Sequence, residues 1–133
     1  MAPLHAILYV SSAVYVPAPQ ELEHLLGRAR ERNARAGVTG LLLNDGGHFV
    51  QYIEGPPEGL LPIYEIILAD PLHHRIQELM SEPIGEREFD GWAMAYERAT
   101  LPAFLTRPRP ERALKASAQQ LLHDVWASHS HHH

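Results

Sequence analysis

The sequence has no cysteine and more acidic than basic residues, with a formal net charge of −5 at pH 7. The lack of cysteine excludes disulfides, thiolate metal ligands and thiol nucleophiles. The lack of a basic excess argues against a nucleic-acid partner, because nucleic acids are bound through positive surface charge. No apolar run approaches the roughly 20 residues of a membrane helix, and residues 1–5 lack the basic region of a signal peptide. We therefore expect a cytoplasmic protein that binds neither nucleic acid nor a membrane.

The 133 residues are enough for one domain with a single core, and 45% hydrophobic and 20% charged residues are typical of a globular protein. We expect a folded domain over residues 1–99, followed by a linker and a C-terminal helix over 100–127. Residues 128–133 read SHSHHH and hold four of the ten histidines. We interpret this end as a purification tag or disordered tail, with a native metal-binding tail as the alternative.

Hydrophobic periodicity predicts strands and helices in alternation. The strands are expected at residues 4–11, 38–43, 47–55, 75–84 and 92–96, and the helices at 22–36, 58–69 and 111–127. Gly37 is expected to end the first helix, and Asn44–Gly47 is a hairpin turn. Two strand–helix–strand units around a central hairpin predict an α+β fold, the ferredoxin-like sandwich β-α-β-β-α-β-β, with two helices on one sheet face and a C-terminal helix.

One glutamine interrupts an otherwise apolar strand. In GHFVQYIEG, Gln51 lies between Phe49 and Ile53 on the same side of the pleat. Its amide has two donors and an acceptor, and a buried amide without partners costs stability. We therefore expect Gln51 to meet a polar group inside the core.

Two further polar residues are expected to face the core. Asn33 falls on the apolar stripe of the first predicted helix, and Tyr9 lies in the first strand on the opposite face from Leu8 and Val10. The alternative for Asn33 is a hydrogen bond to nearby backbone at the helix end, and a tyrosine suits a strand in any case. Together with Gln51, these residues place a phenol and two amides under the helix layer.

This set of side chains does not indicate a catalyst. It contains no activated serine, no evident pair of carboxylates and no phosphate-binding glycine loop. His73 and His74 cannot both face one metal from a regular element, and no third ligand is evident, so we expect no metal site. Amides without a catalytic base suit a planar ligand with alternating donors and acceptors, such as the edge of a flavin ring. A phenol beside that edge would be an electron and proton donor.

Six short motifs, in this order, resemble the BLUF domains, a family of blue-light sensors that use FAD. They are LYVS with Tyr9, NARAGVTGLLL with Asn33, FVQYIEG with Gln51, DPLHH with Asp70 and His73, EPIGEREFDGW, and Trp92-Ala93-Met94. The resemblance covers residues 4–97. It implies the ferredoxin-like sandwich, with the isoalloxazine ring of FAD, or of FMN or riboflavin, held between the two helices on one sheet face.

The resemblance implies a role for each matched residue. Tyr9 would be the donor to the photoexcited flavin, and Gln51 would lie between this phenol and the flavin N5/C4=O edge. Asn33 would bind the pyrimidine side of the ring. Trp92 and Met94, which alternation places on one face of the last strand, would relay the signal by their inward or outward placement. The other implied cofactor contacts are Ser11, Asp70 and His73.

Three positions depart from the family pattern. Arg32 occupies a position that varies within the family, where it could stack against or cover the flavin. Ile66 stands where some members carry a basic residue, so one polar contact to the cofactor is expected to be missing. Asn44 replaces a tyrosine often found at the end of the second strand. None of these departures removes the implied photoactive set.

The resemblance implies a blue-light photoreceptor, not an enzyme, in which light rearranges hydrogen bonds among tyrosine, glutamine and flavin. We expect the change to reach an unidentified downstream protein or to act through a homo-oligomer, because the sequence shows no effector domain.

Two alternatives to the photoreceptor stay open. A small acylphosphatase-like hydrolase would need an arginine in the loop after the first strand, and SSAVYVPAP has none. A flavin-free assembly module would keep the fold without the cofactor.

Overall fold

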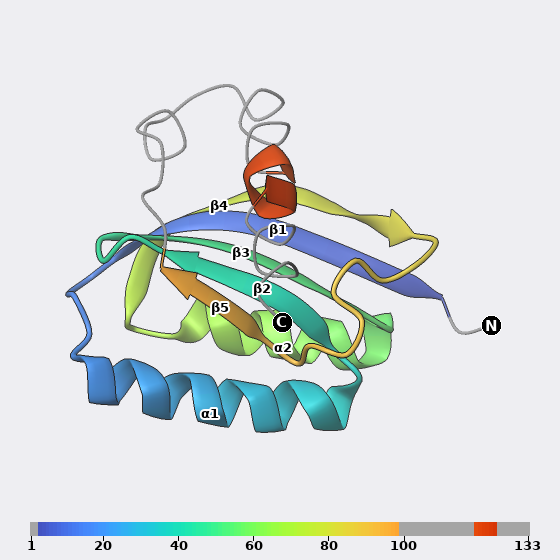
Figure 1. Ribbon diagram of the computed structural model, residues 1–133. Coiled ribbons are helices and arrows are strands. Elements are labelled where there is room, and N and C mark those ends of the chain that lie inside the picture. Colours follow the sequence, from blue (N-terminus) through green and yellow to red (C-terminus); the bar gives the residue numbers. More distant parts are fainter. Residues whose placement is uncertain (1–2, 99–118, 125–133) are drawn as a thin grey trace.

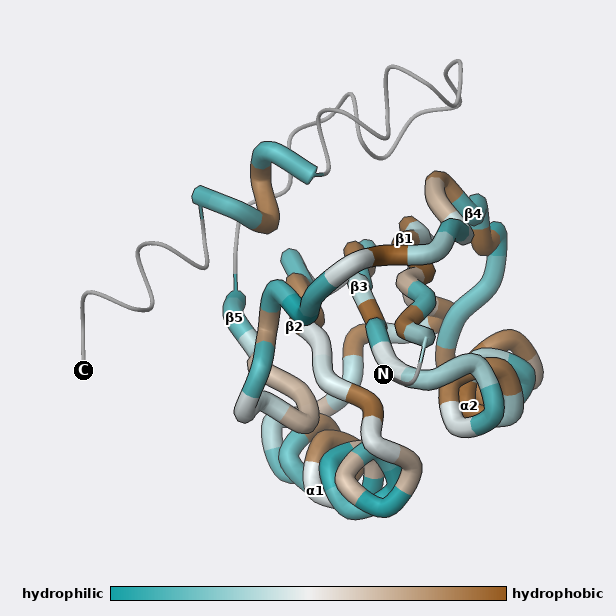
Figure 2. Tube along the Cα trace, turned by 90° about the vertical axis from the view of Figure 1, so that its right-hand side faces the viewer, coloured by the Kyte–Doolittle hydropathy of each residue, from teal (hydrophilic) through white to brown (hydrophobic). Residues whose placement is uncertain are grey.

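The computed structural model describes residues 3–98 and 119–124. Five strands form one mixed sheet, and two long helices cover one of its faces (Figure 1). The strands are β1 (Leu4–Ala13), β2 (Thr39–Asn44), β3 (His48–Gly55), β4 (His73–Ile84) and β5 (Ala95–Arg98), and the helices are α1 (Pro19–Ala36) and α2 (Pro57–Ala69). Residues 119–124 form a short helical segment on the opposite face of the sheet, as Figures 1 and 2 show.

The strand order is β4-β1-β3-β2-β5. β1 lies antiparallel between β3 and β4, and β2 is antiparallel to β3. The first four strands and the two helices therefore form two β-α-β units around a central hairpin. This arrangement confirms the predicted ferredoxin-like α+β fold. β5 extends the sheet beyond β2, to which it runs parallel.

Caps and turns explain where the elements end. Gly37 adopts the left-handed conformation, with φ of 73°, and its N–H bonds back to the last turn of α1, as a C-terminal glycine cap does. In the predicted hairpin turn, the Asp45 carboxylate accepts from the backbone N–H groups of Gly47 and His48, at 2.9 and 2.7 Å. These local bonds fix the register of β2 and β3. β1 pairs with the other edge of β3, in a register that places Tyr9 directly opposite Gln51.

Alternation along the strands divides the apolar residues into two clusters, one on each face of the sheet. The inner cluster lies under the helices, and its buried members are Ile7, Tyr9, Leu26, Val38, Ile53, Leu60, Ile63, Ile67 and Met94. The outer cluster includes Leu8, Leu41, Val50, Tyr52, Phe89 and Leu122. Leu122 is 2% exposed, so the 119–124 segment packs against the outer face.

The last strand is shorter than predicted, and this corrects one expectation. β5 begins at Ala95, so residues 92–94 precede it and do not alternate as strand residues. Trp92 packs against the outer cluster, whereas Met94 and Tyr96 belong with the inner one. The prediction that Trp92 and Met94 share a face is therefore wrong. A turn explains the difference, because the Trp92 N–H donates to the Phe89 carbonyl at 3.0 Å.

Three predictions fall partly or wholly outside the described residues. These are the linker within 100–127, most of the helix expected at 111–127, and the histidine-rich end at 128–133. Residues 119–124 are helical, which agrees with that expectation over their own length. Within residues 3–98 and 119–124, no helix combines the length and the apolar character needed to cross a membrane.

Candidate functional site

A cavity of about 550 Å³ lies between the sheet and the two helices. The sheet contributes Tyr9 and Gln51 to its lining, α1 contributes Arg32, and α2 contributes Ile66. The chain that follows α2 adds Asp70 and His73. The cavity therefore gathers residues from four separate motifs of the sequence. Its volume is in the range of sites that bind small molecules and cofactors.

Tyr9 and Gln51 form a buried pair in this cavity. The Tyr9 hydroxyl donates a hydrogen bond to Gln51 Oε1, and the two residues are 3% and 7% exposed. Burial, and then the neighbouring Tyr64 and Asp70, raise the pKa of the Tyr9 phenol far above its ordinary value of 10.0. The phenol is therefore neutral at physiological pH and remains a hydrogen-bond donor.

The other end of the Gln51 amide points to Met94. Gln51 Nε2 lies 3.6 Å from Met94 Sδ, to which it donates a weak hydrogen bond. The polar partners expected for Gln51 are thus a phenol at its oxygen and a thioether at its nitrogen. Because Met94 lies just before β5, this contact connects the cavity to the last strand of the sheet.

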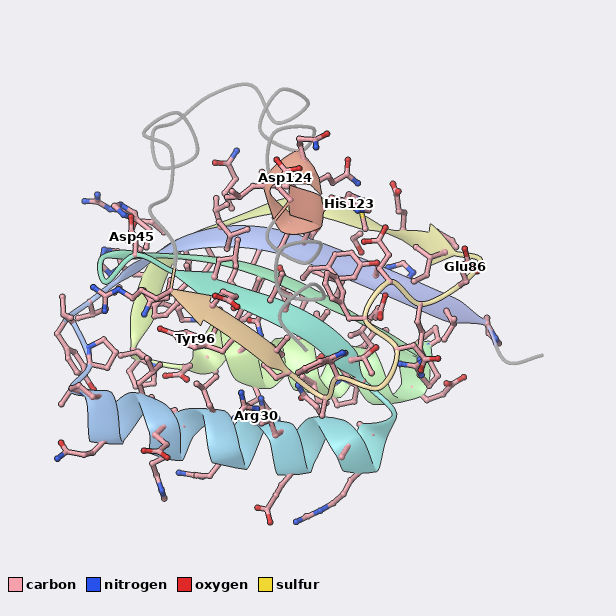
Figure 3. The ribbon with its side chains drawn as sticks, in the orientation of Figure 1. Arg30, Asp45, Glu86, Tyr96, His123 and Asp124 are labelled. Atoms are coloured by element: carbon pink, nitrogen blue, oxygen red, sulfur yellow. The ribbon has the colours of Figure 1, made fainter. Side chains whose placement is uncertain are left out.

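Asn33 connects α1 to the residues just before β5. Its Nδ2 donates to the Ala93 carbonyl at 2.8 Å, so the local backbone alternative for this residue is wrong. Its Oδ1 is buried and has no hydrogen-bond partner among the described residues. One turn earlier, Arg30 Nε donates to the Met94 carbonyl at 2.9 Å (Figure 3 labels Arg30 on the side of α1 that faces β5).

Arg32 presents a second buried polar atom without a partner. Its Nε has none among the described residues, and the side chain lines the cavity. Burial lowers the pKa of this guanidinium, and the nearby Asp70 partly opposes that shift. An unsatisfied donor on Arg32 and an unsatisfied acceptor on Asn33 therefore lie in the same region of α1. Buried polar groups usually have partners, so this pair indicates a missing polar ligand.

His73 and Ser11 stand together at one side of the cavity. Ser11 Oγ is 2.8 Å from His73 Nδ1, and His73 Nε2 is 2.6 Å from the Ile67 carbonyl. Because a carbonyl only accepts, Nε2 is the donor in the bond to Ile67, and the Ser11 hydroxyl is the partner of Nδ1. Asp70 accepts from the Leu72 N–H at 2.9 Å and closes the end of α2. Among the described residues, no group of three or more possible ligands could hold a metal ion.

The structure brings most of the expected site residues together. The cavity lining contains Tyr9, Arg32, Gln51, Ile66, Asp70, His73 and Met94. Ser11 reaches the site through His73, and Asn33 approaches it through Ala93. Trp92 lies on the outer face, away from the cavity. Asn44 is buried at the end of β2, where its Nδ2 is 3.4 Å from the Tyr96 hydroxyl.

Sequence reasoning missed Arg30 and Arg28. Arg28 lines the cavity, and Arg30 holds the Met94 carbonyl. The spacing contained a signal for Arg30, which precedes Asn33 by three residues and so shares its side of a helix. The same rule applied to Arg28, which precedes Arg32 by four residues and shares its side of the helix. In a helix with so many arginines, only the position of the neighbouring elements decides which one turns inward.

Comparison with known proteins gives a consistent result. A model of the BLUF family, described as "Sensors of blue-light using FAD", matches residues 4–95. The blue light- and temperature-regulated antirepressor BluF of Escherichia coli K12 is 40% identical over 70 residues, 53% of this chain. Subunit beta of the photoactivated adenylate cyclase of Euglena gracilis is 33% identical over 86 residues, 65% of this chain. The dark-state structure of BlrB, a BLUF protein, superimposes with a TM-score of 0.69 at 36% identity, over 74% of each chain.

The curated relatives are much longer than the region that they share with this chain. The matching segment spans 17% of the antirepressor and 10% of the cyclase subunit. The similarity therefore concerns only a small part of each relative. Neither the family match nor these relatives support the alternative of a small hydrolase.

Proposed function

This chain belongs to the BLUF family of blue-light sensors that bind flavin, and we propose that the cavity between α1 and α2 holds the isoalloxazine ring. The donor set supports this placement. Arg32 Nε and Asn33 Oδ1 are a buried donor and a buried acceptor without partners among the described residues. The pyrimidine side of a flavin offers both acceptors and a donor, so one ring can satisfy both residues. We propose FAD as the natural cofactor, with FMN and riboflavin as ligands that share the same ring.

The other contacts of the ring are proposed from the lining of the cavity. His73 and Asp70 stand beside the space that the ring would fill, and Ile66 of α2 adds an apolar side chain to the same lining. Ser11 would act indirectly, by holding the orientation of the His73 ring. In this proposal, Arg32 takes the polar role that Ile66 cannot fill.

Tyr9 and Gln51 are proposed as the photoactive pair. When bound, the flavin supplies absorption of blue light and an excited state that withdraws an electron. Tyr9 is placed to give up the electron and, through its hydrogen bond, a proton toward Gln51 Oε1. Once the proton has moved, the Gln51 amide can rotate or tautomerise, which changes the groups that it offers to its neighbours. The electron and a proton would then return to Tyr9, so that no net oxidation remains. The observation that carries this proposal is the buried Tyr9–Gln51–Met94 chain beside the cavity.

Met94 is proposed to receive the change. A reoriented Gln51 would no longer present Nε2 to Met94 Sδ, so the stretch before β5 would lose one of its contacts. A single hydrogen bond of this kind is worth about 1 kcal/mol, and allosteric coupling commonly lies at roughly 1–3 kcal/mol. Such an energy shifts an equilibrium about 5- to 150-fold and does not unfold a domain. We therefore propose a modest displacement of residues 92–94 as the output.

An absorption spectrum tests the proposed function directly. Purified protein should be yellow, or become yellow with added FAD, and blue light should shift the flavin band to longer wavelength. The shift should reverse in the dark, because no covalent bond to the flavin is made. A chain that stays colourless with FAD would leave the flavin-free assembly module as the better explanation.

The partner is a separate proposal. The related antirepressor and cyclase subunit are named for different outputs, so the family does not decide what this chain regulates. We propose that it signals to another protein or through self-association. Size-exclusion chromatography with light scattering, in the dark and under blue light, should show a homo-oligomer or a light-dependent change of mass. An unchanging monomer would exclude self-association and leave a separate partner protein.

A further inference from the structure

Glu54 is a fully buried carboxylate on the outer face of the sheet, at 0% exposure. It lies on β3, three residues after Gln51, and alternation turns the two side chains to opposite faces. Tyr52, the other outer-face residue between them, belongs to the outer cluster. A buried carboxylate is unusual unless hydrogen bonds satisfy it, and nothing in the proposed photochemistry uses Glu54.

Both oxygens of Glu54 accept hydrogen bonds from the chain that leads to β5. Oε1 accepts from the Glu88 N–H at 2.8 Å, and Oε2 accepts from the Phe89 N–H at 2.8 Å. Oε2 also accepts from the Thr39 hydroxyl at 2.6 Å. Bonds from backbone donors to an ionised acceptor are about twice as strong as neutral ones. The carboxylate therefore fixes the backbone at residues 88 and 89.

Two neighbouring side chains complete this arrangement. Arg87 donates to Thr39 Oγ1 at 2.9 Å and to the Gly37 carbonyl at 2.7 Å, which ties the same stretch to the end of α1. Burial, and then the nearby Glu54 carboxylate, raise the pKa of the Tyr52 phenol above its ordinary value. The phenol of Tyr52 is therefore neutral beside this carboxylate.

Residues 88–94, here called the crossing segment, pass from the outer face of the sheet to the inner face. Phe89 is buried in the outer cluster, and Met94 is buried in the inner one. Between them, the Trp92 N–H donates to the Phe89 carbonyl, and the Trp92 carbonyl accepts from the Gly40 N–H, both at 3.0 Å. At the inner end, Gln51 contacts Met94. β3 therefore holds the crossing segment at both ends, by residues three positions apart.

We propose that Glu54 is a positioning residue that fixes the outer end of the crossing segment and thereby places Met94 against Gln51. The placement needs only the contacts described above, without flavin. Its consequence for light signalling rests on the proposed function. With residues 88 and 89 held by Glu54, a change at Gln51 can displace residues 92–94 but not the start of the segment. Glu54 would thus decide where the movement stops.

The substitution Glu54→Gln tests the placement with little change in size. An amide has only one acceptor oxygen, so its NH₂ group must face either the Glu88 N–H or both the Phe89 N–H and the Thr39 hydroxyl. In the full chain, amide exchange at Glu88 or Phe89 should accelerate by roughly 10-fold or more. The Met94 methyl resonance should shift, and it can be assigned because the chain has only three methionines. Glu58→Gln, which neutralises an exposed carboxylate in the first turn of α2, is the matched control and should change neither signal.

Trp92 gives an independent measurement. The chain has two tryptophans, so Trp126→Phe leaves Trp92 as the only tryptophan, which can be excited selectively over the tyrosines. In that background, Glu54→Gln should shift the Trp92 emission maximum, and Glu58→Gln should not. Faster exchange at Phe89 with unchanged Met94 and Trp92 signals would overturn the proposal, because Glu54 would then stabilise its own loop without placing the segment.

A second variant covers the case in which Glu54→Gln does not fold. Thr39→Val keeps the shape of the side chain and the carboxylate but removes one donor to Oε2. It should move the Met94 and Trp92 signals in the same direction by a smaller amount, and unchanged signals would reject the positioning role.

With flavin bound, Glu54→Gln should keep the red shift but alter the light-induced change in Trp92 emission. A parent protein without any red shift would contradict the proposed function, while the Met94 and Trp92 measurements would still decide the role of Glu54.

Discussion

The Gln51 amide has two unlike partners, and this explains how it can be both stable and switchable. Its oxygen accepts from the Tyr9 phenol, a good donor, whereas its nitrogen meets the Met94 thioether, a weak acceptor. Turning the amide by half a turn would place its NH₂ group against the Tyr9 hydroxyl. Two donors would then face each other unless the phenol had lost or redirected its proton. The orientation is therefore tied to the protonation of Tyr9, which burial keeps neutral.

Removal of the phenol oxygen should separate cofactor binding from the light response. In Tyr9→Phe the ring still fills its place in the inner cluster, so flavin should bind with affinity within about threefold of the parent. Gln51 Oε1 loses its donor, which should lower the free energy of unfolding by about 1–3 kcal/mol. The reversible red shift should disappear, because no group at that position can give up an electron and a proton. A normal shift in absorption spectra of the illuminated variant would disprove the role of Tyr9.

Asn33→Ala tests the pyrimidine-side contact. The substitution removes both the unpaired Oδ1 and the donor to the Ala93 carbonyl. Loss of one hydrogen bond to a ligand corresponds to roughly a 10-fold weaker flavin affinity, which fluorescence titration can measure. Arg35→Ala, an exposed change in the last turn of the same helix, is the control and should leave the affinity unchanged. An unaltered affinity in Asn33→Ala would show that the ring lies elsewhere.

At the scale of elements, α1 and α2 approach each other closely where α1 ends and α2 begins. Gly59, in the first turn of α2, lies against the last residue of α1, and a Cβ added there would be 2.2 Å from the Ala36 carbonyl oxygen. Backbone atoms cannot move aside as the end of a flexible side chain can. The two helices can therefore touch at this point only because residue 59 has no side chain.

Gly59→Ala should consequently widen the gap between the helices. Overpacking of this kind costs about 1–3 kcal/mol of stability, and the displaced helices should also weaken flavin binding. Gly27→Ala is the matched control, because a Cβ at Gly27, in the interior of α1, meets nothing within 4 Å. That change should instead stabilise the protein by about 0.5–1 kcal/mol. Thermal unfolding and flavin titration of both variants would test this, and equal effects would exclude the close approach as the cause.

The elements also show how far the sequence could predict the structure. Periodicity and turn residues predicted α1, α2 and the β2–β3 hairpin well, because Gly37 and Asp45 act through local bonds. The site residues Gln51 and Asn33 could also be predicted from the sequence, because an amide in an apolar position is unusual wherever it occurs. The opposite placement of Trp92 and Met94 could not be predicted. It depends on the hydrogen bond that the Trp92 carbonyl accepts from the Gly40 N–H and on the one that the Phe89 N–H donates to Glu54, and both partners lie far away in the sequence.

At the scale of the whole molecule, the sheet separates the cavity from the helical segment at 119–124, and the crossing segment links the two sides. On the outer face, Glu88 at the start of the crossing segment is 3.6 Å from His123, and Gln119 donates to Met80 Sδ at 3.4 Å. Both residues of the Glu88–His123 pair are exposed, so this contact adds little stability. The contact nevertheless places residues 119–124 next to the start of the crossing segment. Because Glu54 holds residues 88 and 89, we expect a displacement of residues 92–94 to leave this outer contact unchanged.

Alkaline pH provides a test of how the whole structure buries its phenols. The pKa values of Tyr9, Tyr52 and Tyr64 all lie above the ordinary value of 10.0, with burial as the largest cause in each case. A raised pKa in the folded state means that stability is complete below about pH 10 and falls above it, as the unfolded phenols ionise first. For the fully buried Tyr9 the loss should be about 1.4 kcal/mol per pH unit. Urea unfolding between pH 8 and pH 11 should show this slope, and Tyr9→Phe should reduce it. A free energy of unfolding that stayed constant above pH 10, with phenolate absorbance rising in the folded protein, would mean that these phenols are open to solvent.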